Sequence, residues 1–136
     1  ASIGVGPVTV SASILAQFAT EGSQNTDLGD VLYYDLAAAY RVMGGRHQHG
    51  DGTTESHRAL NLVLELNGDW RTKEETSGMK DPHSGGNTLY ISPGVRFTHP
   101  AGFTSWLSVG VPISQDLNGK QPDATMRVLA GVAQAF

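Results

Sequence analysis

The chain has 136 residues, a formal net charge of −4 and no cysteine. Charged residues make up only 16% of it, against roughly 25% in soluble domains, and Gly, Ser, Thr and Asn take their place. The lack of a Lys/Arg cluster argues against nucleic acid as a partner, and the lack of cysteine excludes disulfides and thiolate metal sites. No apolar run of about 18 residues occurs, so we expect no transmembrane helix.

Alternating apolar and polar residues run through most of the chain. They predict β-strands, because successive side chains of a strand point to opposite faces. The alternating segments are residues 8–20, 32–42, 60–71, 89–97, 103–114 and 126–136. Pro93 has no amide proton for a strand ladder, so we expect a bulge or local irregularity in its segment. The pattern predicts about six antiparallel strands joined by hairpins.

The length and polarity of these segments favour a membrane protein. About 9 to 11 tilted residues cross a bilayer, whereas strands of soluble domains are more often about 5 to 6 residues long. The polar faces carry mostly Ser, Thr, Asn, Gly and Ala, as expected of a water-filled lumen. We therefore expect an all-β fold, an antiparallel up-and-down transmembrane β-barrel, with residues 1–136 forming a single segment of it. The expected location is a bacterial outer membrane, whose lipid is then a partner.

The ends of the predicted strands give an orientation. The chain ends on Phe136 in an alternating strand, a pattern typical of outer-membrane proteins, whose C-terminus is periplasmic. Counting back places residues 99–102 and 44–56 on the periplasmic side, and 21–30, 74–87 and 118–120 on the extracellular side. Aromatic residues of the apolar faces then form two girdles, one extracellular and one periplasmic. The two sets are Phe18, Tyr34 and Trp70, and Tyr40, Phe97, Phe103 and Phe136.

Four runs of residues resemble a known family. They are FATEGSQNTDLGDVLYYDLAAAYRV, LVLELNGDWRTKEE, DPHSGGNTLYISPGVRF and VGVPISQDLNG. Together they resemble the C-terminal half of the outer-membrane transporters or porins associated with meta-cleavage phenol-degradation pathways. The resemblance implies a barrel of about twelve strands that passes small molecules, hydrophobic or aromatic ones included. About eight strands are needed to close a barrel. We therefore expect a fragment, an incompletely resolved chain, or one part of a barrel that another chain completes.

Several charged residues fall on the predicted lumen side. They are Asp35, Arg41, Glu65, Asp69, Arg71, Arg96 and Arg127. On neighbouring strands, these acids and arginines could pair laterally and line a small barrel as structural ion pairs. Alternatively, they could form a polar constriction that selects solutes, with Arg96, Arg127 and Glu65 as the first candidates.

The segment RHQHGDGTTESH is a candidate metal site. It places His47, His49 and His57 close to Asp51 and Glu55, a donor set that suits Zn, Cu or Ni. The alternative is a solvated loop without metal, because the glycines preorganise it poorly. We expect no other cofactor.

Other functions have weaker support. Glu74, Glu75 and Asp81 could bind Ca²⁺ but lack a regular ligand spacing, and the residues around Asp81 are first of all turn formers. No G-x-S-x-G or similar nucleophile motif is present, so we expect no enzyme. Two alternatives stay open: a soluble secreted β-barrel or sandwich that binds a small ligand on its polar face, and a structural outer-membrane protein with a metal-binding histidine loop.

Overall fold

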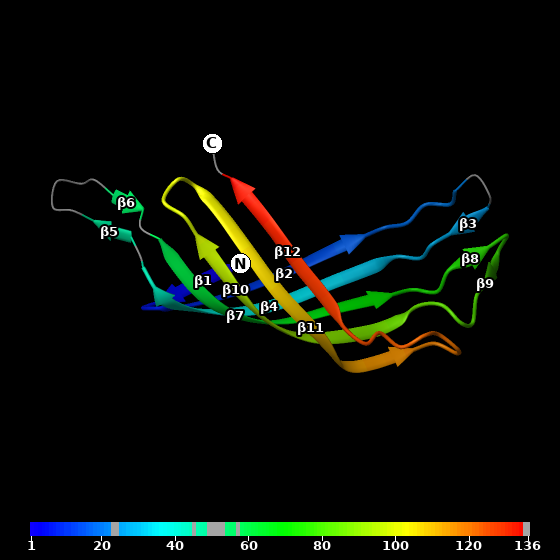
Figure 1. Cartoon of the computed structure of the whole chain (residues 1–136). Helices are drawn as coiled ribbons and strands as arrows, with labels where there is room; N and C mark the ends of the chain where they lie inside the picture. The colour runs from blue at the N-terminus through cyan, green and yellow to red at the C-terminus, as the bar shows by residue number, and fades with distance from the viewer. Residues whose placement is uncertain (23–24, 45, 49–53, 57, 135–136) are drawn as a thin grey trace.

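A computed structural model describes residues 1–22, 25–44, 46–48, 54–56 and 58–134, and over these it is an all-β structure (Figure 1). Its main element is a 7-stranded antiparallel sheet with the order β1-β2-β4-β7-β10-β11-β12. These strands are β1 (Ser2–Val5), β2 (Val8–Gln17), β4 (Val31–Met43), β7 (Ala59–Arg71), β10 (Gly86–Thr98), β11 (Phe103–Leu117) and β12 (Arg127–Gln134). A 3-stranded sheet holds β3 (Thr26–Asp27), β8 (Glu75–Thr76) and β9 (Met79–Lys80), and a 2-stranded sheet holds β5 (Arg46–Gln48) and β6 (Thr54–Ser56).

All six alternating segments form strands of the main sheet, which confirms the predicted antiparallel all-β class. The additional strand, β1, pairs with β2 and escapes a periodicity search because it has only 4 residues. The sheet is open: in the part of the chain that the structure describes, β1 and β12 are its two edges.

The predicted irregularity near Pro93 is present in the ladder between β10 and β11. Paired positions run from Ile91↔Val111 to Gly94↔Ser108 and pass over Pro93. Ser92 is skipped as well, the register is the same on both sides of this gap, and it shifts only between Leu89 and Tyr90, before Pro93.

The register of the main sheet keeps the predicted faces continuous across the strands, except at the end of β11 beyond the register shift, where Leu89 pairs with Ser114. On one side, Leu36 lies opposite Ala12 and Leu66, and Leu66 lies opposite Ile91. On the other side, Asp35 lies opposite Ser13 and Asn67. We call these two sides the apolar face and the polar face.

The connections between neighbouring strands gather at the two ends of the sheet (Figure 1). The tight turns between β1 and β2 and between β10 and β11 lie at one end with the β5–β6 hairpin, and this end is called the turn end. The connections that follow β2, β7 and β11 lie at the opposite, loop end. This sorting of the connections agrees with the one expected from the sequence.

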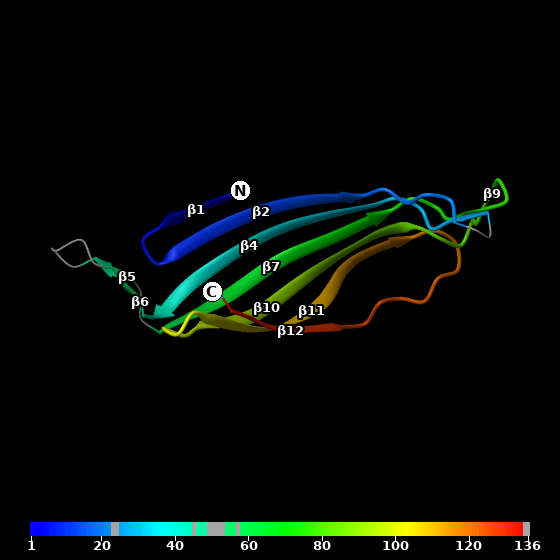
Figure 2. The same ribbon diagram turned by 90° about the horizontal axis from the view of Figure 1, so that it is seen from above.

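The main sheet is a single curved layer, and none of the other described segments packs on it as a second layer (Figure 2). The accessible surface of the chain is 9472 Å², whereas a globular protein of 14.4 kDa exposes about 6,800 Å². Within the described residues, Val31 is the one buried hydrophobic side chain. No helix in the same part of the chain is long and apolar enough to span a bilayer.

Burial in this sheet is the reverse of that in a soluble protein. On β7, the apolar-face residues Leu62 and Leu64 are exposed, at 51% and 50%, while Glu65 and Asn67 on the polar face are half-buried. The most buried side chain of the polar face is Ser92, at 0% exposure. The sheet therefore curves around its polar face, and its apolar face is the convex, uncovered one.

Candidate functional site

A chain of hydrogen bonds crosses the middle of the polar face, over β2, β4, β7 and β10. The Ser13 hydroxyl donates to Asp35 Oδ2 at 3.2 Å, and Asn67 Nδ2 donates to Asp35 Oδ1 at 2.9 Å. Ser92 in turn donates to Asn67 Oδ1 at 2.7 Å. Because each polar group has a partner, the half-buried amide and the buried hydroxyl are stabilised without water.

Arg127 of β12 extends this polar strip across β11. Its guanidinium carbon lies 4.1 Å from the centre of the Tyr90 ring, a cation–π geometry. The arginine can pass over β11 because Gly110 lies between: a Cβ there would come within 2.8 Å of Arg127 and 2.9 Å of the Ser92 hydroxyl. Arg127 Nε is buried and has no hydrogen-bond partner among the described residues.

The seven predicted lumen charges all lie on the polar face, at different depths between the two ends. Nearest the turn end, Arg41 and Arg96 both pair with Asn61, one from each side. Glu65 lies four positions further along β7. Arg127 lies in the same row of paired positions across the strands. The remaining three charges, Asp35, Asp69 and Arg71, lie progressively closer to the loop end.

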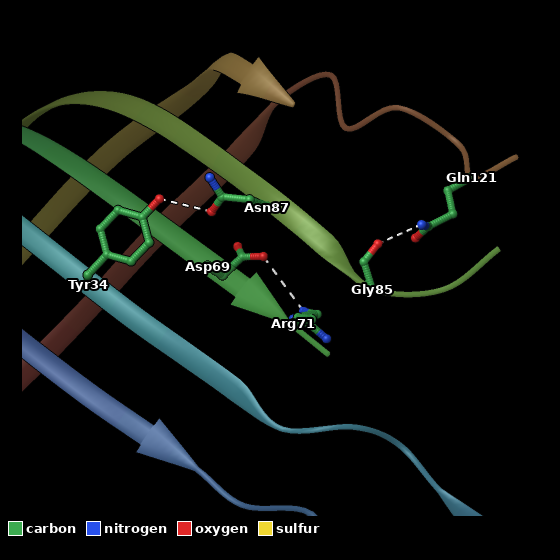
Figure 3. A network of polar contacts seen from close by, with 6 residues as sticks. All are labelled: Tyr34, Asp69, Arg71, Gly85, Asn87 and Gln121. Carbon is green, nitrogen blue, oxygen red and sulfur yellow. Dashed lines mark hydrogen bonds and ion pairs between the residues drawn. The ribbon is translucent and has the colours of Figure 1, made fainter. Parts of the chain in front are cut away.

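Lateral ion pairs between neighbouring strands, one of the two expectations, do not form among these charges. The ion pair found within the described residues joins Arg71 Nε to Asp69 Oδ1 at 3.6 Å, along one strand rather than across two (Figure 3). The arginine side chain is 54% exposed, so solvent screens the pair and its contribution to stability is small.

Of the three constriction candidates, two come together. Glu65 and Arg96 line one hollow of about 500 Å³ on the polar face, with Trp106 and Leu129. Arg127 lies outside this lining and stacks on Tyr90 instead. The hollow thus combines an acid, a base and an apolar wall.

Hydrogen bonds tie the connections at the loop end into one structure. The Gln121 amide donates to the carbonyl oxygen of Gly85 at 2.7 Å, so the β11–β12 connection is held against the β7–β10 connection (Figure 3). The backbone N–H of Lys120 also donates to His83 Nδ1 at 2.9 Å. In the β2–β4 connection, the backbone N–H of Asp30 donates to Thr72 Oγ1 at 2.7 Å. This end of the sheet therefore has a fixed shape around a hollow of about 420 Å³.

Aromatic residues of the apolar face lie toward the two ends, as predicted. Tyr34 and Trp70 lie near the loop end of β4 and β7, and Phe97 and Phe103 flank the turn at the other end. His99 in that turn stacks on Phe103, with ring centres 4.7 Å apart. Phe136 lies outside the described residues.

The candidate metal loop is only partly within the described structure. His47 and Glu55 are paired positions of the β5–β6 hairpin, while His49, Asp51 and His57 lie outside the described residues. Elsewhere in the described ranges, no three His, Cys, Asp or Glu residues are grouped to hold a metal. The metal site stays a prediction.

The carboxylate of Asp81 accepts the backbone N–H of His83 at 2.8 Å. This is the turn chemistry that its sequence indicates, and it favours the turn interpretation over a Ca²⁺ ligand.

Sequence reasoning missed three features of the polar face. The half-buried Asn67 and the buried Ser92 form the hydrogen-bonding centre of the face, although in the sequence they are only two of many small polar residues. The large apolar Trp106 departs from the alternation of its segment, yet it lies opposite Arg96 and Gly131 on the polar face. The parity of residue numbers along β11 places it there.

Comparisons with known proteins add no identity. Neither the family models, nor the curated proteins, nor the solved structures contain a match to this chain.

Proposed function

We propose that this chain forms part of the wall of an outer-membrane β-barrel through which small molecules pass. The observation that carries the proposal is the reversed burial of the sheet: uncovered leucines on the convex face, and buried, hydrogen-bonded polar groups on the concave one. Water does not stabilise a continuous apolar face of this extent, whereas lipid does. The polar face would then line the passage.

Three further features support this assignment. The strands β4, β7 and β10 each have 13 residues, enough to cross a tilted bilayer span. Their connections are sorted by end, and aromatic side chains lie near both ends of the apolar face. The resemblance to the transporters or porins associated with phenol degradation points to the same function and to small molecules, hydrophobic or aromatic ones included.

The two open edges require partners in this proposal. Unpaired backbone N–H and C=O groups on β1 and β12 cannot face hydrocarbon, since each would lack a hydrogen-bond partner there. We expect further strands, from the same protein or from another chain, to pair with both edges and close the barrel.

Refolding with and without lipid tests the membrane location. We expect the chain to aggregate in buffer alone and to gain β-structure, measured by circular dichroism, in detergent or lipid vesicles. A chain that stays soluble and monomeric without either would exclude the membrane location and favour the soluble ligand-binding alternative.

Vesicle permeability tests passage separately. Vesicles that contain the protein should become permeable to small solutes, and replacement of Glu65, Arg96 and Arg127 by Gln should change the rate or the charge preference. Membrane insertion without permeability would exclude passage and favour the alternative of a structural outer-membrane protein. A permeability unaffected by the three replacements would remove those side chains from the pathway.

A further inference from the structure

The hollow of about 500 Å³ at the turn-end half of the polar face has an unusual lining for such a face. Trp106 and Leu129 contribute large apolar surfaces to it, although both lie on the polar side of the sheet. Their exposures of 40% and 47% show that close to half of each residue's surface is left uncovered. The hollow therefore offers an apolar wall that a ligand can bury.

The indole that forms part of this wall is held in place from behind. Trp106 lies directly opposite Gly131 on β12, and a Cβ at position 131 would overlap the indole ring. The ring thus rests on the backbone of β12 and leaves its other side to the hollow. A wall fixed in this way binds a ligand with little loss of side-chain entropy.

Two arginines and one acid lie at this part of the polar face. Arg96 lines the hollow opposite Trp106, and Arg41 lies in the same cross-strand row beyond Asn61. In the described part of the chain, neither arginine has a carboxylate within ion-pair distance. Glu65 also lines the hollow but forms no ion pair with either arginine, so the Arg96 guanidinium is free to meet a ligand.

An apolar wall beside an unpaired guanidinium matches one class of ligand. We propose that this hollow binds small organic carboxylates, with the carboxylate on the Arg96 guanidinium and the apolar body against Trp106 and Leu129. Guanidinium and carboxylate groups form two parallel charge-assisted hydrogen bonds. Thr104 and Ser108, which also line the hollow, add hydroxyl donors beside the carboxylate. The inference gives the proposed passage a substrate class and rests on it.

The fluorescence of Trp106 provides a local test. The chain has two tryptophans, so a Trp70→Phe variant leaves Trp106 as the reporter. This variant, folded in detergent, is titrated with hexanoate, with neutral hexanamide and with hexylammonium. We expect hexanoate to change the emission saturably, and the amide and the cation to bind about ten-fold more weakly or worse, because they lack the charge-assisted pair.

Two further variants separate recognition from partition into detergent. Arg96→Gln should weaken hexanoate binding about ten-fold or more. Arg58→Gln is the control, because it also removes one positive charge at the turn end but Arg58 does not line the hollow. This variant should bind hexanoate as the unmodified chain does. Circular dichroism confirms that both variants are folded.

Three results would overturn the inference: no saturable change with hexanoate, equal affinity for hexanamide, or unchanged affinity in Arg96→Gln. If vesicles become permeable but any of these holds, the proposed passage stands and its substrate class is wrong. Saturable, Arg96-dependent binding by a protein that stays soluble without lipid would leave the carboxylate site in place and exclude the passage.

Discussion

The ring of Tyr34 on β4 crosses Gly68 on β7 and its hydroxyl donates to Asn87 Oδ1 on β10 at 2.9 Å (Figure 3). One side chain thus connects three strands of the apolar face. A Cβ at position 68 would overlap the ring, so the contact requires glycine there. Packing an aromatic ring over a glycine restores the side-chain contact that glycine itself cannot make.

Gly68→Ala should therefore destabilise the folded chain. The new methyl group would force the Tyr34 ring away and break its hydrogen bond to Asn87, for a loss of about 1 to 3 kcal/mol. Urea titration in detergent, followed by tryptophan emission, measures the change in the free energy of unfolding.

Gly4→Ala is a matched control for this substitution. Gly4 also lies in a strand of the main sheet, but a Cβ there would meet its nearest atom at 3.5 Å, an ordinary contact. The Gly68→Ala/Tyr34→Ala double variant should lose less than the sum of the two single variants. Additive losses would show that ring and glycine do not interact.

Asn67→Ala should cost about 1 to 3 kcal/mol of unfolding free energy, because it removes two hydrogen bonds at once. It leaves the fully buried Ser92 hydroxyl and one carboxylate oxygen of Asp35 without their partners. Asn61→Ala is the control, since within the described structure that amide has no side-chain hydrogen bond. Equal losses for the two variants would rule out a special contribution from the polar chain.

Leu64→Arg and Val63→Arg place the same charge on opposite faces of β7. In lipid vesicles, the change on the apolar face should cost about 2 to 4 kcal/mol of folding free energy near the bilayer midplane. The change on the polar face should cost less, because Val63 lies between the small residues Ala39 and Gly94. The measurement is urea unfolding from vesicles. A smaller loss for Leu64→Arg than for Val63→Arg would place the apolar face in water.

Gln121→Ala should loosen the loop end without unfolding the sheet. The glutamine side chain donates to the carbonyl oxygens of Gly85 and Asn118, at 2.7 and 2.8 Å. Without it, trypsin should cut faster after Lys80 and Lys120, which mass spectrometry of timed digests will show. Gln17→Ala is the control, because the Gln17 amide has no hydrogen bond within the described residues. This variant should leave the cutting rates unchanged. Unchanged rates in Gln121→Ala would indicate that other contacts alone hold the connections together.

The strands and their faces could be predicted from the sequence, because an alternation of period two needs only the residues of one strand. The leucines of β7 show this most clearly, and their exposure on one face agrees with the pattern. The 2-residue strands β3, β8 and β9 could not be predicted, since so few residues have no periodicity.

Contacts between strands depend on register, which bulges change and a single-strand pattern does not contain. Tyr34 meets Gly68 only because β4 and β7 pair with one particular offset, and a bulge follows at residues 41–43 of the same ladder. Arg127 reaches Tyr90 across a strand, at the one row where Gly110 leaves space. The residues of the candidate site were therefore predictable, but their partners were not.

The most direct test of the central claim measures which solvent each face of β7 meets. Because the chain has no cysteine, single cysteines at positions 62 to 67 can carry a spin label in lipid vesicles. We expect labels at Leu62, Leu64 and Leu66 to be accessible to oxygen in the lipid and shielded from a water-soluble nickel chelate. Labels at Val63, Glu65 and Asn67 should show the opposite. Equal access of the nickel chelate to both sets would contradict a membrane-facing apolar side.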